Sequence, residues 1–141
     1  MTLLWREQLS VGNNVIDGDH KYLIEIINKA EQSMRVKNRS ALAATLDALS
    51  TYSLVHFERE EKIAAAVGYT QVPHLNASHQ ELMKQLAHIR GEIDAMGNEC
   101  STEAIEHFTL FLRDWLINHV IKEDLLMKPT LQQFSPSFDP R

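Results

Sequence analysis

The residues of this chain that could do chemistry are histidines and acids at positions where apolar residues are expected. His56 and Glu60 occupy successive positions of an otherwise apolar helical stripe, and His79 and His119 interrupt two further stripes in the same way. A buried carboxylate without a partner is costly, so such a residue is either paired or bound to a metal. Imidazole and carboxylate without thiolate suit iron, manganese or zinc. The pattern therefore predicts a metal site.

Four helical segments are predicted from the spacing of the apolar residues, which follows the period of an α-helix. We expect them to run from Asp19 to Lys37, from Ser40 to about Gly68, from just after Pro73 to about Gly97, and from Ser101 to Pro129. Short connections between long helices favour antiparallel neighbours. The sequence therefore predicts an all-α protein, an up-down-up-down antiparallel four-helix bundle with an irregular N-terminal arm.

One domain is expected for the 141 residues, with an arm over residues 1–18, the bundle over 19–128 and a loose tail over 129–141. No apolar run approaches the roughly 20 residues of a membrane span, and no secretory segment is recognisable, so we expect a cytoplasmic protein away from membranes. The formal charge of −5 argues against nucleic acid as a partner. The single cysteine excludes an internal disulfide and a CxxC motif.

The polar residues of the stripes fall at one end of the predicted bundle. His20 lies at the start of the first helix and His79 near the start of the third, whereas His56, Glu60 and His119 lie near the ends of the second and fourth. In an antiparallel bundle these positions share one end. The step from His56 to Glu60 places both side chains about 40° apart on one face, so the carboxylate can bridge two metals.

Helical spacing does not identify Asp124 as a metal ligand. It follows His119 by five residues, and in an ideal α-helix it would point about 140° away from that histidine. From spacing alone it is interpreted as a solvent-exposed acid.

At this point the motifs resemble those of the hemerythrin family, in particular its bacterial branch, from Trp5 to about Met127. The matching pieces are Trp5 followed by Gly12, Ile16-Asp17-x-x-His20-Lys21, His56-Phe57-x-x-Glu60-Glu61, Gly68-Tyr69, His79-x-x-Leu82, and Trp115-Leu116-x-x-His119-x-x-x-x-Asp124. Several ligand motifs thus occur in order and at suitable separations.

The resemblance implies two iron ions with an oxo or hydroxo bridge and the reversible binding of dioxygen, in a carrier, storage or delivery protein rather than an enzyme. It places His20 and His56 on the iron that keeps an open position for dioxygen, and His79 and His119 on the other iron. Glu60 and Asp124 resemble the bridging carboxylates. This resemblance is what turns Asp124 from a surface acid into an expected ligand.

One position departs from the family pattern. The family carries a fifth histidine four residues before the one that His79 matches, and Leu75 fills that position here. His74 is the nearby substitute. In a regular helix it would lie about 140° from His79, but Pro73 before it could leave it in a non-helical first turn that swings inward. If His74 does not bind, the second iron has two histidines and an open coordination position, and holds its ion less firmly.

Other functions stay open at this stage. A di-iron redox enzyme or a scavenger of peroxide or nitric oxide is one alternative, which the missing histidine favours slightly. The lack of any Glu-x-x-His step argues against the ferritin-like enzymes. A sensor of oxygen, redox state or iron and a metal-free bundle for protein contacts are the others. For a carrier, Leu23, Ile24, Ile27 and Trp115 are candidates for an apolar wall around the site, and ordinary core packing is the alternative interpretation of each.

Overall fold

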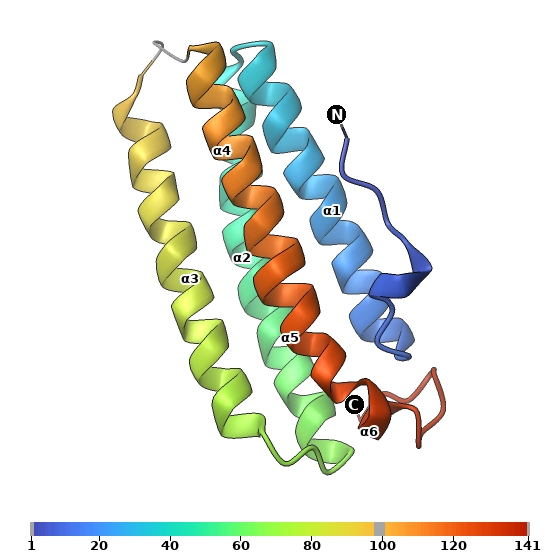
Figure 1. Cartoon of the computed structure of the whole chain (residues 1–141). Helices are drawn as coiled ribbons and strands as arrows, with labels where there is room; N and C mark the ends of the chain where they lie inside the picture. The colour runs from blue at the N-terminus through green and yellow to red at the C-terminus, as the bar shows by residue number, and fades with distance from the viewer. Residues whose placement is uncertain (1, 98–100, 141) are drawn as a thin grey trace.

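The computed structural model describes residues 2–97 and 101–140, apart from the side chain of His119. Four helical rods lie side by side in alternating directions (Figure 1), and the described ranges contain no strand. After the short η1 (Glu7–Leu9), the first three rods are α1 (Asn14–Arg35), α2 (Arg39–Ala66) and α3 (Val72–Ala95). The fourth rod joins α4 (Thr102–Asp114), η2 (Trp115–Ile121), α5 (Lys122–Asp124), η3 (Leu125–Met127) and α6 (Lys128–Leu131). The predicted all-α up-down-up-down bundle is confirmed.

The first helix begins five residues earlier than the expected start at Asp19. The side-chain oxygen of Asn13 accepts hydrogen bonds from the backbone N–H groups of Val15 and Ile16, at 3.0 and 3.2 Å. These bonds satisfy donors that a helix start leaves free, so the helix can begin at Asn14. His20 consequently lies in the second turn of the helix and not at its N-terminus.

The last rod changes its winding where it approaches the polar end of the bundle. Residues Trp115–Ile121 form a π-helix, whose hydrogen bonds span five residues instead of four. The helical path also continues through the expected end at Pro129, which stands in the first turn of α6. Proline is tolerated there because the first turn of a helix does not use its missing N–H.

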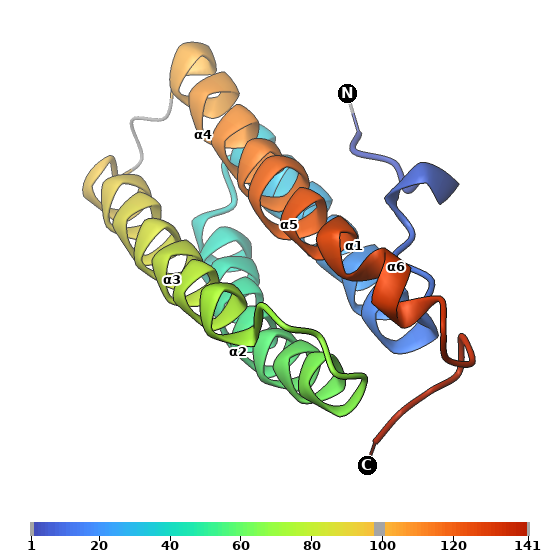
Figure 2. The ribbon, with the colours of Figure 1, turned by 60° about the horizontal axis from the view of Figure 1, so that its bottom comes forward.

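The two chain ends are attached to α1. In the N-terminal arm, the backbone of Leu3 exchanges two hydrogen bonds of 2.9 Å with the side chain of Asn28. The C-terminal segment turns back at the end of the bundle (Figure 2), where the Pro136 carbonyl accepts from the backbone N–H of Asn14 at 2.7 Å. The expectation of a loose tail was therefore wrong, because backbone and side-chain partners at the start of α1 hold it.

The apolar core is divided into two clusters. The larger lies in the middle of the bundle and at its far end, where α1 connects to α2; the near end is the one where α2 connects to α3. In the smaller cluster, at the near end, each rod contributes at least one residue, among them Ile16, Ile63, Leu75 and Met127. Along their rods, His20, Glu60, His79 and Asp124 lie between the residues of these two clusters, and His56 adjoins Phe57 of the larger one. None of the described helices combines the length and the hydropathy needed to cross a lipid bilayer.

Candidate metal centre

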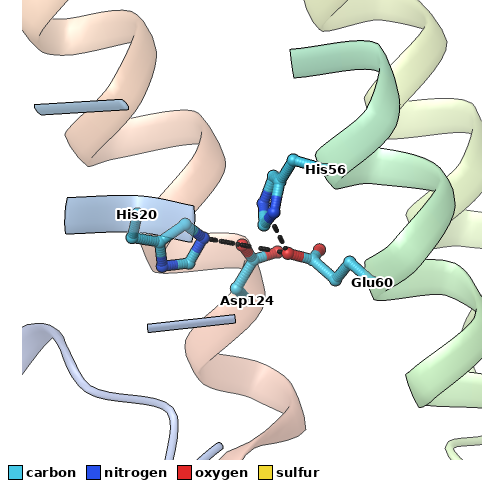
Figure 3. A group of neighbouring side chains, drawn as sticks. All are labelled: His20, His56, Glu60 and Asp124. Carbon is cyan, nitrogen blue, oxygen red and sulfur yellow. Dashed lines mark hydrogen bonds and ion pairs between the residues drawn. The ribbon is translucent and has the colours of Figure 1, made fainter. Parts of the chain in front are cut away.

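Four polar side chains from three rods meet between the two apolar clusters. His20 comes from α1, His56 and Glu60 from α2 and Asp124 from α5 (Figure 3), and all four are fully buried. One nitrogen or oxygen atom of each lies within 4.8 Å of the corresponding atoms of the others. Two imidazoles and two carboxylates this close together form a donor set for a hard or borderline metal ion.

The Glu60 carboxylate lies between two groups of nitrogen atoms. Its Oε2 is 3.0 Å from His56 Nε2 and 3.8 Å from His20 Nε2. Its Oε1 faces the other way and lies 3.1 Å from His79 Nε2. A carboxylate with its two oxygens turned to different imidazoles has the placement that a bridge between two metal ions requires.

His79 stands beside the group of four and is held on both sides. Its Nδ1 lies 3.0 Å from Glu61 Oε2, and its ring stacks on Phe57 with 4.1 Å between the ring centroids. Because Glu61 occupies Nδ1, the Nε2 atom is the one that is left to face Glu60 and the centre. This is the arrangement in which an outer carboxylate orients an imidazole toward a metal.

Asp124 lies in the group, contrary to its interpretation as a surface acid from spacing alone. Its Oδ2 is 2.8 Å from His20 Nε2, and the side chain is fully buried. The reason is the π-helix over Trp115–Ile121, which takes up an additional residue before Asp124. The ideal angle of about 140° assumed α-helical winding throughout, and the π-helix breaks that assumption.

The remaining site candidates, His119, His74 and Leu75, do not belong to the described group. His119 stands in η2, but its side chain lies outside the described part of the chain, so its role as a ligand stays a prediction. The ring of His74 is 61% exposed and lies 3.5 Å from Glu123, outside the group. Leu75 is buried in the smaller apolar cluster. The structure thus brings together His20, His56, Glu60, His79 and Asp124, and it does not bring His74 to them.

Sequence reasoning missed the residues that orient His56. Asp19 Oδ2 lies 2.9 Å from His56 Nδ1, and its carboxylate also accepts from Tyr52 at 2.6 Å and from Arg59 at 3.1 Å. The available signal was local: Asp19 precedes His20, and Tyr52 and Arg59 stand four residues before and three after His56. These contacts leave His56 Nε2 facing the group.

Burial and mutual proximity shift the pKa values of the four groups in the metal-free protein. Burial lowers the pKa of His20, whereas for His56 the carboxylates of Glu60 and Asp19 outweigh burial and raise the pKa to about 9. Burial and the nearby charge of Glu60 raise the pKa of Asp124 well above its usual range. Burial also acts to raise the pKa of Glu60, but Asp124 and the two imidazoles outweigh it and lower that pKa. Metal binding would displace the protons held here.

The donor set fits a metal ion on a second ground. Within the described structure, His20 Nδ1 and Asp124 Oδ1 are buried without a hydrogen-bond partner, and His56 Nε2 and Glu60 Oε2, although 3.0 Å apart as an ion pair, make no hydrogen bond either. Leaving a buried polar atom unpaired costs about 1–3 kcal/mol. Four such atoms in one group are explained if a cation completes the interactions of those that face it.

The four apolar residues expected near the site belong to the larger cluster. Leu23, Ile24, Ile27 and Trp115 are all buried there, as the sequence predicts. Trp115 is fixed by a 3.0 Å hydrogen bond from its Nε1 to the Leu82 carbonyl.

Comparison with known proteins agrees with this geometry. The family model described as the hemerythrin HHE cation-binding domain matches residues 11–131. The chain is 32% identical to a bacteriohemerythrin of Methylococcus capsulatus, over 93% of this chain and 98% of that protein. It is 30% identical to a hemerythrin-like protein of Naegleria gruberi, over 90% and 92% of the two chains. A crystal structure of wild-type hemerythrin superposes with a TM-score of 0.77 at 30% identity, over 93% of this chain and 98% of that one. The chain belongs to the hemerythrin family.

Proposed function

We propose that this protein is a non-haem di-iron protein that binds dioxygen reversibly, as a carrier, storage or delivery protein and not as an enzyme. The observation that carries the proposal is the buried group of His20, His56, Glu60 and Asp124, with His79 on the far side of Glu60. Membership of the hemerythrin family supports iron as the metal.

In this proposal, His20, His56, Glu60 and Asp124 would hold one ion. His79 and the predicted ligand His119 would hold the other, and Glu60 and Asp124 would serve both. A pair of ferrous ions would supply the electrons and the coordination position that dioxygen needs. Asp19 and Glu61 would hold the imidazoles of His56 and His79 in the orientation for binding.

The protein's part in reversibility is to keep the site dry. The donors of the group of four have no exposed surface, and Trp115 and Ile24 belong to the apolar cluster that borders them. Few protons and little water can then reach the site, and this favours release of the ligand over its reaction.

The test is anaerobic reconstitution with ferrous iron, followed by a metal count per chain and optical spectra before and after oxygen. We expect about two irons and absorption bands that appear with oxygen and disappear on its removal. Zero or one iron per chain would refute the di-iron proposal. Steady turnover of added peroxide would instead identify a redox enzyme.

A further inference from the structure

The second ion position differs from the first in what surrounds it. Around the first, two imidazoles and two carboxylates are gathered within 4.8 Å. At the second, Glu60 Oε1 lies 3.1 Å from His79 Nε2, and the proposed function adds the shared Asp124 and the predicted ligand His119. One helical turn before His79 on α3 stands Leu75, which is 2% exposed and packs in the smaller apolar cluster. His74 stands in the same turn, but its ring is exposed and lies beside Glu123 instead of the centre.

The same side of the centre is also the side nearest to solvent. A groove of about 450 Å³ runs between α2 and α3, and His79 and Phe57 are among its lining residues. His79 keeps 4% of its surface exposed, whereas His20, His56, Glu60 and Asp124 keep none. Within the described side chains of the centre, contact with solvent therefore occurs at His79.

The lining of the groove suits a small cation. Glu58 and Glu61 contribute two carboxylates from α2, opposed by the single ammonium group of Lys84 from α3. Glu61 contacts both His79 Nδ1, at 3.0 Å, and Asn76 Nδ2, at 2.6 Å, so one carboxylate joins the rim to the buried imidazole. A cleft with an excess of negative charge raises the local concentration of cations.

We propose that the ion beside His79 is the more readily exchanged one of the pair, because its side of the centre is the one that reaches solvent, and that it enters and leaves through the groove between α2 and α3. The inference rests on the proposed di-iron function. The groove supplies the route, and Leu75 leaves this position without a further imidazole from α3.

The experiment loads the full chain with cobalt(II), an air-stable substitute for ferrous iron, and follows its release to excess EDTA. We expect two ions per chain and two release phases, whose rates differ by at least about tenfold. Even the loss of an outer contact to a metal ligand typically changes affinity 10–100-fold. Leu75→His should slow the faster phase by about tenfold or more, and Leu75→Met, which keeps the apolar packing, should leave it unchanged.

The route is tested separately with Gln80, an exposed residue of the groove. Gln80→Trp should slow both uptake and release of the faster ion by about the same factor, so that its affinity stays constant. Gln80→Ala is the matched control and should leave both rates at or above the wild-type values. Glu58→Gln should slow uptake, and Glu25→Gln, an exposed carboxylate on α1 away from the groove, should not.

The outcomes separate the two proposals. Two ions released in one phase would overturn the inference and leave the di-iron function standing. Binding of no ion would overturn both. Two phases that Gln80→Trp leaves unchanged would overturn the groove as the route. Circular dichroism shows whether Leu75→His folds. If it does not, the release phases of the wild type and of the Gln80 variants still test the inference.

Discussion

Asp19 shows how much of the site depends on a residue that is not among the expected ligands. Its carboxylate joins His56, Tyr52 and Arg59. Burial acts to raise its pKa, but the hydrogen bonds from His56 and Tyr52 outweigh burial and lower it, so the group stays ionised. An ionised acceptor keeps the proton of His56 on Nδ1 and leaves Nε2 for a metal.

Asp19→Asn should therefore weaken metal binding about 10–100-fold. The amide keeps the size of the side chain but loses the charge that orients His56. The measurement is isothermal titration with cobalt(II), and Asp47→Asn, at an exposed position on α2, is the control. Equal affinities for Asp19→Asn and the wild type would show that the contact has no orienting role.

At the scale of elements, the π-helix decides which residues of the last rod reach the centre. A π-helical turn takes one residue more than an α-helical turn. Removing one residue inside Trp115–Ile121 can thus be absorbed by a return to α-helix, with α4 and the residues from Asp124 onward still facing the core. Removing one residue from a regular α-helix instead turns everything beyond it by about 100°.

We predict that deletion of Asn118, an exposed residue of η2, leaves a folded chain with unchanged helical content. The matched control is deletion of Glu106, an exposed residue of α4, which puts the apolar residues on its two sides out of phase. That control should lose about 3 kcal/mol or more of the free energy of unfolding. Circular dichroism and urea unfolding of the metal-free chains measure both effects, and equal destabilisation would contradict the explanation.

A largely buried ion pair outside the metal centre joins α1 to α4. Glu31, whose side chain is 8% exposed, accepts from Arg113 at 2.7 Å and from Arg35 at 2.9 Å. Burial acts to raise the pKa of Glu31, but the hydrogen bonds from the two arginines outweigh it, and the pKa is lower than its ordinary value of 4.5.

Glu31→Gln should cost about 1–3 kcal/mol of the free energy of unfolding at pH 7. A group whose pKa is lower in the folded chain stabilises it above the unfolded pKa and loses that contribution as the pH falls through the folded pKa. The difference between wild type and variant should therefore shrink below about pH 4.5. Urea unfolding across pH measures this, with Glu25→Gln as the exposed control. A difference that grows in acid would contradict the prediction.

At the scale of the whole molecule, the chain ends complete the near end of the bundle. Phe134 and Phe138 pack against the smaller apolar cluster, which includes Ile16 and Leu75. The Phe138 carbonyl also accepts from the side chain of Asn13, the residue that caps α1. The C-terminal segment therefore supports the layer on which the polar group rests.

Phe138→Ala should lower the free energy of unfolding by about 1–2 kcal/mol, since the ring is half-buried and its apolar area is lost. Thermal unfolding of the metal-free chain measures the change, and Ser137→Ala at an exposed neighbour is the control. A melting temperature that does not move would mean that the tail is attached by its backbone alone.

The sequence by itself determined the bundle and the end at which the site lies. Apolar residues at helical spacing must face a core, and His56, Glu60 and His79 break those stripes at heights that an antiparallel bundle brings together. The same stripes place Leu75 in the core, where it is found. These inferences hold because they depend on the period of a regular helix and on which ends are neighbours.

Tertiary structure alone decided the features that depart from regular winding or depend on contacts between rods. Asp124 reaches the centre because η2 takes up an additional residue, and a stripe analysis with one fixed period cannot detect that. His74 turns to Glu123 at the surface, and Asp19 reaches across from α1 to His56. Side chains distant in sequence come into contact through the packing of the helices. The spacing of residues within a single helix does not determine that packing.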